Sequence, residues 1–169
     1  PLAGYGSRFV KAGYREPKPL IEISGKPMII QAARSLPASQ QHIFVCLSDH
    51  IQSYPLEKVI KGEFPYADVL AIDGVTEGQA ITCAIGLEGV DDKCSLLIAA
   101  TDNGIIYSHQ RYRSLVENVN VDAVVFTFRN HVSSNNNPHM YGWVKIDSSG
   151  NVKGVSVKVP ISDEPCKDH

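Results

Sequence analysis

The chain has 169 residues, a net charge of −2, and a composition in which 43% of residues are hydrophobic and 20% are charged. These values are ordinary for one globular domain with a core of its own. The near-neutral charge, without a basic stripe, argues against a nucleic acid as the main partner. No apolar run approaches the roughly 18 residues of a membrane span, and no basic start precedes an apolar stretch. We therefore expect neither a membrane partner nor secretion.

The four cysteines are scattered and include no Cys-x-x-Cys pair; they are Cys46, Cys83, Cys94 and Cys166. This spacing argues against a zinc site and against a disulfide framework. Cys46 and Cys83 lie in apolar segments and are predicted to pack as small buried hydrophobes. A reducing cytoplasm is the simplest compartment for such a chain.

Short apolar runs alternate with helical patterns, which is typical of a parallel sheet with crossover helices. In chain order we predict a strand at 20–23, a helix at 27–36, a strand at 42–47, a helix at 55–62, a strand at 67–72, a helix at 77–87, a strand at 95–100, a helix at 109–118 and a strand at 123–128. The run at 95–100 (SLLIAA) is the most apolar, so it is predicted to be the central strand.

The alternation changes after Asn130. Residues 133–138 (SSNNNP) are predicted to form a polar loop, and residues 140–146 and 152–158 two antiparallel strands joined by a turn. The predicted fold class is α/β, with a mostly parallel central sheet and an antiparallel C-terminal part.

Both ends of the chain read as interrupted. Pro1-Leu2 has the character of the tail of a first strand, and the last four residues directly follow a strand-like segment. We expect a single domain over residues 1–169 that is truncated at both ends.

The strongest chemical signal lies in the first thirty residues, where Gly4 and Gly6 stand in a short loop, Arg8 follows, and Lys18 stands between two prolines. Glycines let the backbone approach a ligand, and the exposed N–H groups of such a loop bind phosphate oxygens. The planar fork of Arg8 and the compact charge of Lys18 are suited to phosphates as well. The segment therefore predicts a triphosphate site.

Two other phosphate motifs fail against this sequence. A dinucleotide-binding loop needs a third glycine where Phe9 stands. A P-loop needs Ser or Thr after Gly-Lys, and Gly25-Lys26 is followed by Pro27.

Three linked blocks carry a family resemblance: residues 2–9 (LAGYGSRF), 17–20 (PKPL) and 25–28 (GKPM). In this order they resemble the opening of nucleotidyltransferases that activate sugar phosphates, such as glucose-1-phosphate thymidylyl- and uridylyltransferases. The resemblance implies a Rossmann-like three-layer α/β/α (GT-A-like) nucleotidyltransferase fold. It implies that a nucleoside triphosphate and a sugar 1-phosphate react to a nucleotide sugar, a precursor for polysaccharide biosynthesis, and pyrophosphate.

The resemblance also implies roles for residues in these blocks. Arg8 would steady the β- and γ-phosphates, and Lys18 the acceptor phosphate. The nucleotide would further contact the loop residues Leu2, Ala3, Gly4 and Gly6.

Asp102 directly follows the predicted central strand. In an open α/β sheet, ligands bind outside the carboxyl ends of the strands, so Asp102 and the glycine loop should share one rim. Mg²⁺ takes hard oxygen ligands, usually one or two carboxylates plus phosphates and water. The family carries a catalytic, metal-binding Asp here, so Asp102 is predicted to bind Mg²⁺; the alternative is a solvated turn or a helix cap. The family's second metal-binding carboxylate would lie beyond residue 169.

The segment at 76–80 (TEGQA) matches a family block in which a glycine approaches the nucleobase. Gly78 would take that role, with Gln79 as a further nucleotide contact. The alternative for Gln79 is a capping box with Thr76. The family often places a base-reading Gln some five residues before that glycine, where this chain has Asp73, so the base remains open.

Gly142 and Lys158 match family positions that contact the sugar and the sugar phosphate. Trp143 could stack on a sugar, although a core or interface position is the simpler interpretation. A strand lysine that extends into solvent is the alternative for Lys158. The family usually has Glu where this chain has Val157.

Val157 and Asp73 keep two other functions open. One is a cytidylyltransferase for an alcohol phosphate, such as phosphocholine or methylerythritol phosphate. The other is a regulatory subunit of the same fold that binds nucleotide without turnover. The sequence also leaves open whether the chain forms a homo-oligomer.

Overall fold

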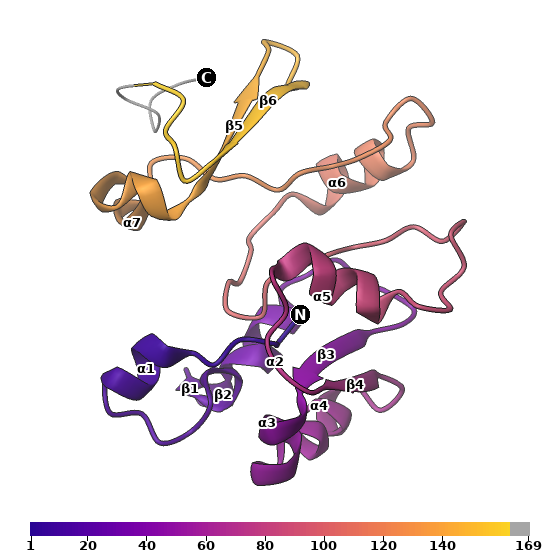
Figure 1. Cartoon of the computed structure of the whole chain (residues 1–169). Coiled ribbons are helices and arrows are strands. Elements are labelled where there is room, and N and C mark those ends of the chain that lie inside the picture. The colour runs from indigo at the N-terminus through magenta and orange to yellow at the C-terminus, as the bar shows by residue number, and fades with distance from the viewer. Residues whose placement is uncertain (163–169) are drawn as a thin grey trace. The chain divides into compact units, whose positions relative to one another are not determined.

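Two parallel strands form the central sheet of the first half of the chain (Figure 1). Strand β3 (Ile43–Leu47) pairs with β4 (Asp68–Ile72), in register from Ile43 opposite Asp68 to Leu47 opposite Ile72. Leu2 adds one parallel bridge to Cys46, and its N–H donates to the carbonyl of Val45 at 2.6 Å. The apolar sequence of β3 suits this place because parallel strands are covered on both faces.

The computed structural model describes residues 1–162, which fall into two compact units, Pro1–His109 and the residues from Gln110 onward. Each unit is described by itself. Cys166 lies outside the described residues. No described helix has the length and apolar character needed to cross a bilayer.

Helices and short turns of unit 1 surround the strand pair. The elements are α1 (Ser7–Lys11), the 3-10 turn η1 (Lys18–Leu20), β1 (Glu22–Ile23), β2 (Lys26–Pro27), α2 (Met28–Arg34), α3 (Ser48–Ser53), α4 (Leu56–Glu63) and α5 (Gln79–Gly86). The predicted helices at 27–36, 55–62 and 77–87 correspond to α2, α4 and α5. Helix α3 follows β3 without a loop and was not predicted.

The core of unit 1 joins α2 and α4 to β3. Its buried side chains form one cluster: Leu2, Leu20, Ile29, Ile30, Ala33, Phe44, Cys46, Leu56, Ile60 and Ala67. Helix α5 packs on β3 through Gly86, where an added Cβ would lie 2.8 Å from Cγ2 of Val45. Glycine thus lets this helix approach the strand closely.

The predicted strands at 95–100 and 123–128 form no ladder with the described residues. A strand exists through hydrogen bonds to a neighbour, so apolar sequence alone does not make one. Thr101 lies beside Pro1, but the contact there is a hydrogen bond from its side-chain hydroxyl and not a ladder bond between backbones. Leu96 and Ile98 remain 56% and 57% exposed. The prediction that 95–100 is the central strand is therefore wrong, and β3 holds that place.

Unit 2 contains an antiparallel β-hairpin, whose register shifts between Lys145 and Ile146 (Figure 1). Strand β5 (Gly142–Ile146) runs antiparallel to β6 (Val152–Val157), which confirms the predicted strand pair. Helix α6 (His109–Val116) confirms the predicted helix at 109–118. The predicted polar loop at 133–138 is instead a short helix, α7 (Val132–Asn136), followed by the 3-10 turn η2 (Pro138–Met140). The ring of His131 caps α7 by accepting from Ser133 N at 3.2 Å.

Candidate functional site

The glycine loop leaves the sheet directly after Leu2. Because Leu2 pairs in parallel with Cys46, the loop emerges at the carboxyl end of β3. Ala3 is half-buried, whereas Gly4 and Tyr5 are exposed. An added Cβ on Gly4 would meet no described atom within 4 Å, so the backbone is open to a ligand there.

Gly6 brings this loop against Lys18. Its φ of 60° and ψ of 31° lie in the left-handed region, which glycine adopts without strain. An added Cβ would lie 3.1 Å from Cβ of Lys18. Two separate constraints, backbone conformation and close approach, therefore require glycine at this position.

Lys18 and Asp102 form an ion pair although they stand 84 residues apart. The side chains remain 27% and 32% exposed, so a ligand can reach them. The ammonium of Lys18 also lies 5.5 Å from the ring centroid of Phe9. Exposed ion pairs contribute little to stability, so the contact matters for where the two groups lie. The structure thus brings Gly6, Lys18 and Asp102 together.

Asp102 has one further side-chain contact. Asn103 donates from Nδ2 to its Oδ1 at 3.1 Å. No group of three or more His, Cys, Asp or Glu side chains that could hold a metal ion occurs among residues 1–162. A single accessible carboxylate still fits Mg²⁺, which usually takes one or two carboxylates and completes its shell with phosphates and water.

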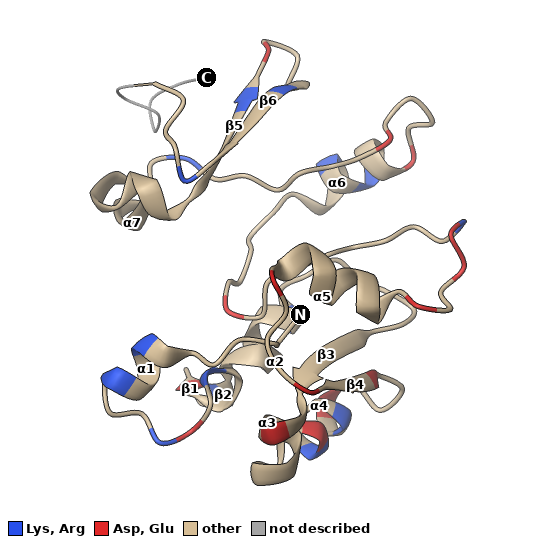
Figure 2. Ribbon diagram, viewed as in Figure 1, with Lys and Arg blue, Asp and Glu red and all other residues tan. Residues whose placement is uncertain are grey.

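Arg8 lies on α1 and is exposed. It forms no ion pair with the described part of the chain. Figure 2 shows basic residues on α1, and Arg8 and Lys11 are the two in its sequence. The guanidinium is therefore free to bind an anion beside the loop.

Gly78 lies at the start of α5, in extended backbone with φ 178°. Its carbonyl accepts from the hydroxyl of Thr76 at 2.9 Å, and Thr76 Oγ1 lies 2.6 Å from the hydroxyl of the buried Thr82. The capping-box alternative for Gln79 is wrong, because the N-cap is Gly78 and no side chain caps this helix. Gln79 is the first helical residue and is exposed.

A polar cavity of about 120 Å³ lies where β3 and β4 end. Its lining residues are Tyr5, Leu47, Ser48, Asp49, Ile72, Asp73 and Gly74. The hydroxyl of Ser48 donates to Oδ1 of Asp73 at 2.6 Å. Because Tyr5 belongs to the glycine loop, the cavity adjoins the predicted phosphate site.

Three of the polar side chains in this lining were missed by the sequence analysis: Tyr5, Ser48 and Asp49. The rule that ligands bind at strand ends could have found the last two, since they follow β3 directly. Burial lowers the pKa of the neighbouring His50, and the charge of Asp49 raises it in part. Its ring is therefore neutral at pH 7 and adds no charge to offset the two carboxylates.

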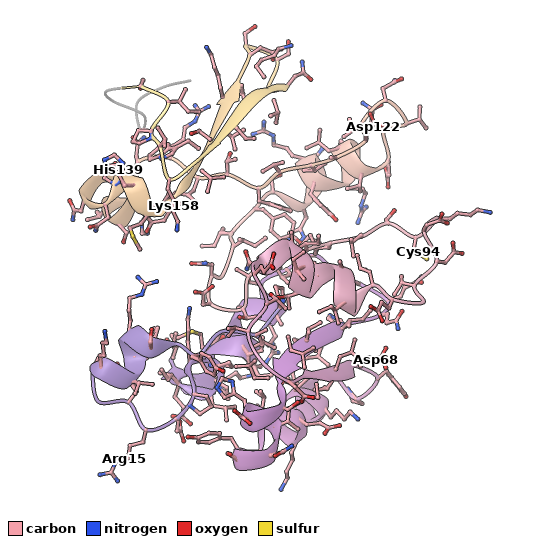
Figure 3. The ribbon with its side chains drawn as sticks, in the orientation of Figure 1. Arg15, Asp68, Cys94, Asp122, His139 and Lys158 are labelled. Carbon is pink, nitrogen blue, oxygen red and sulfur yellow. The ribbon has the colours of Figure 1, made fainter. Side chains whose placement is uncertain are left out.

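The two remaining site residues belong to unit 2. Gly142 begins β5 opposite Val157, and Lys158 follows β6 with a left-handed φ of 60°. Lys158 N donates to the carbonyl of Tyr141 at 2.9 Å. Figure 3 labels Lys158 and His139, whose Nδ1 lies 3.4 Å from the carbonyl of Lys158. Lys158 thus directly follows the last residue of β6 and is exposed, so both its predicted role and its alternative as a lysine extending into solvent stay open.

Trp143 is held within unit 2. Its indole N–H donates to the carbonyl of Pro138 at 3.0 Å, and the ring is half-buried. This contact ties β5 to η2 and agrees with the interpretation of Trp143 as a packing residue.

The chain is similar to known proteins in sequence and in fold. The sequence pattern of the nucleotidyl transferase family matches residues 2–158. The fold resembles that of a nucleoside-diphosphate-sugar pyrophosphorylase from Vibrio cholerae RC9, with a TM-score of 0.57 and 20% sequence identity. That likeness covers 96% of this chain and 67% of the other. No curated protein sequence matches the chain. The predicted α/β fold class is confirmed.

Proposed function

The chain belongs to the nucleotidyl transferase family, and on that premise we propose that it couples a nucleoside triphosphate to a sugar 1-phosphate, giving a nucleotide sugar and pyrophosphate. The proposal rests mainly on the ion pair between Lys18 and Asp102, which lies beside the glycine loop. A backbone open to phosphates, a cation and a metal-binding carboxylate are the groups that this transfer needs. The fold's likeness to a nucleotide-sugar enzyme supports a sugar phosphate as the acceptor.

In the proposed reaction, an oxygen of the acceptor phosphate attacks the α-phosphorus in line. The new P–O bond forms as the bond to pyrophosphate breaks. The attacking phosphate is already anionic, so no general base is required. Catalysis then consists of positioning and charge stabilisation. A Mg²⁺ ion bound through Asp102 would offset the charge on the phosphates.

Each predicted site residue of unit 1 has a proposed role in this reaction. Leu2, Ala3, Gly4 and Gly6 present backbone to the triphosphate. Arg8 steadies the β- and γ-phosphates, and Lys18 steadies the acceptor phosphate. Gly78 and Gln79 contact the nucleoside. Gly142 and Lys158 of unit 2 remain predictions as contacts to the sugar and its phosphate.

The cavity beside the loop suggests a preference among bases. Asp73 and Asp49 line it, and carboxylates accept hydrogen bonds but do not donate them. A base with an exocyclic amino group offers them an N–H2 donor, whereas uracil and thymine offer a single N3–H donor that lies between two carbonyl oxygens. The acidic lining therefore favours cytosine, adenine or guanine, and it is consistent with the cytidylyltransferase alternative.

The proposal is tested by a coupled pyrophosphate-release assay with Mg²⁺. The common nucleoside triphosphates are crossed with sugar 1-phosphates and with alcohol phosphates such as phosphocholine. Release with one sugar 1-phosphate supports the proposal, and release only with an alcohol phosphate selects the alternative acceptor. If no pair of substrates releases pyrophosphate but a thermal-shift assay still detects nucleotide binding, the result indicates a regulatory subunit.

We expect Arg8→Ala and Asp102→Asn each to lower the turnover roughly 10²–10³-fold, as removal of one electrostatic group does in other enzymes. Lys11→Ala on the same helix and Asp92→Asn on an exposed loop are the matched controls, which should keep wild-type turnover. Unchanged turnover in the Arg8 variant would remove that residue from the scheme.

A further inference from the structure

The segment that carries Asp102 is fixed at both ends by side-chain hydrogen bonds. On one side the hydroxyl of Thr101 donates to the carbonyl of Pro1 at 3.4 Å. On the other, the N–H of Ile105 donates to the hydroxyl oxygen of Ser35 at 3.0 Å. Residues 101–105 make no backbone–backbone hydrogen bond to the described residues. These two contacts hold the backbone of the segment, while Lys18 and Asn103 contact the carboxylate of Asp102 itself.

Ser35 is the better defined of the two anchors. It is the C-cap residue of α2, and its hydroxyl donates to the carbonyl of Ala32 at 2.7 Å. The same oxygen accepts from Ile105, so the donor points along the helix and a lone pair points at the segment. An added Cβ on Gly104 would lie 3.6 Å from this oxygen, so the segment passes close to Ser35.

The helix behind Ser35 is firmly packed. Five of the seven residues of α2 are buried: Met28, Ile29, Ile30, Ala32 and Ala33. A segment bonded to the end of this helix takes its position from the core of unit 1. In contrast, the preceding run at 95–100 has no ladder among the described residues that could fix it.

We propose that Ser35 is a positioning residue, which holds the segment 101–105 so that Asp102 can bind the divalent cation. This inference rests on the proposed function, since it takes Asp102 as the metal ligand. Ser35 itself touches neither metal nor substrate in this scheme. Its effect should appear in metal affinity and in the metal concentration that supports the reaction.

Replacement of Ser35 by Ala leaves the N–H of Ile105 without its acceptor and frees the segment. Loss of one such hydrogen bond corresponds to roughly three- to tenfold weaker binding. We expect Ser35→Ala to weaken binding of Mn²⁺, used in place of Mg²⁺, by that factor. In the pyrophosphate assay the Mg²⁺ concentration for half-maximal rate should rise equally, while the rate at saturating Mg²⁺ stays near that of the wild type.

The test measures free Mn²⁺ by electron paramagnetic resonance during titration of the full chain. It compares the wild type with Ser35→Ala, Ser35→Thr and Asp102→Asn. Ser39→Ala is the matched control, because its hydroxyl bonds only Gln41 and His42 in the described structure. Ser35→Thr keeps the hydroxyl and should restore binding. Ser35→Cys fills the same space with a weak acceptor, so it replaces the alanine variant if that variant does not fold.

Weaker binding in Ser35→Ala or Ser35→Cys, restored in Ser35→Thr and unchanged in Ser39→Ala, supports the inference. Wild-type affinity in both Ser35→Ala and Ser35→Cys overturns it, as does failure of Ser35→Thr to restore binding. Wild-type affinity in Asp102→Asn has a different meaning, because it removes the metal role of Asp102 from the proposed function. The two failures are therefore distinguishable.

Discussion

Gly6 tolerates a side chain poorly for two reasons, its left-handed backbone conformation and its close neighbour Lys18. We expect Gly6→Ala to lower the free energy of unfolding by about 1–2 kcal/mol, the cost of a left-handed residue with a Cβ. The added methyl also meets Lys18 at 3.1 Å and must displace it. Urea unfolding measures the stability, and pyrophosphate release measures the consequence for Lys18.

Gly4→Ala is the matched control for this prediction. An added Cβ there meets nothing within 4 Å, and Gly4 is not among the residues with positive φ. The unfolding midpoint should therefore stay close to that of the wild type. Equal stabilities for the Gly4 and Gly6 variants would contradict the argument from conformation.

Single residues also show which parts of the candidate site could be predicted from the sequence. The glycine loop and Asp102 are predicted to share one rim from their positions relative to the predicted strands. The structure brings Asp102 into contact with Lys18, which lies against Gly6 of that loop. The anchor of that contact could not be predicted. Ser35 stands 70 residues from Ile105, and nothing in a helix C-cap indicates which distant N–H it accepts.

At the scale of an element, the packing of α5 on β3 depends on Gly86. An added Cβ would lie 2.8 Å from Cγ2 of Val45, a side chain in the buried strand. We expect Gly86→Ala to destabilise the chain by about 1–3 kcal/mol through overpacking, despite the higher helix propensity of alanine. Thermal unfolding measures the loss.

The matched control is Gly62→Ala in α4, where an added Cβ meets nothing within 4 Å. Here helix propensity acts alone, so stability should rise by up to about 1 kcal/mol. The two substitutions are chemically identical and should have opposite signs. A stabilised Gly86 variant would show that α5 does not pack closely on β3.

The β5–β6 hairpin depends on the charge of Asp147. The side chain and backbone of Asn151 donate to its carboxylate, Lys153 pairs with it, and Ser149 N donates as well. These contacts hold the pKa of Asp147 well below its usual range. A lowered pKa means that the ionised form stabilises the folded hairpin. This contribution is complete above the unfolded pKa and disappears as the pH falls through the folded pKa.

We expect Asp147→Asn to weaken the hairpin at pH 7, with a difference from the wild type that shrinks once the pH falls below about 4. Fluorescence of Trp143, the single tryptophan of the chain, follows β5 directly during urea unfolding. Lys145→Gln, a charge change on the same hairpin that leaves the Asp147 contacts in place, is the control. A difference that does not depend on pH would contradict the role of the charge.

Across the whole chain, the protection of backbone amides from hydrogen exchange should follow their hydrogen bonding. Amides of β3 are paired and buried, whereas the apolar run at 95–100 has no ladder partner among the described residues. We expect hydrogen–deuterium exchange of the run at 95–100 to be far faster than that of β3. Exchange is read peptide by peptide by mass spectrometry. Equal protection of the two segments would show that 95–100 pairs in solution.

Local pattern predicted most elements of the fold but not their neighbours. Helices α2, α4, α5 and α6 and the β5–β6 hairpin follow from periodicity and turn residues in short stretches of sequence. Whether an apolar run becomes a strand depends on a partner elsewhere in the chain, so 95–100 was misjudged. The strand-end rule could have indicated Ser48 and Asp49 of the cavity, but not that Asp73 lies beside them, because that depends on which strands are neighbours.

Cys46 is completely buried between Leu2 and β4, so chemical modification of its thiol can report when the core of unit 1 unfolds. Burial raises the pKa of this thiol to about 12, so it carries almost no thiolate at neutral pH. Cys94 is exposed and Cys83 is half-buried. Of the three cysteines that the structure describes, a thiol reagent should therefore modify Cys94 first, and Cys46 only when the core separates. The rate of that last modification follows the unfolding of unit 1 without any added label.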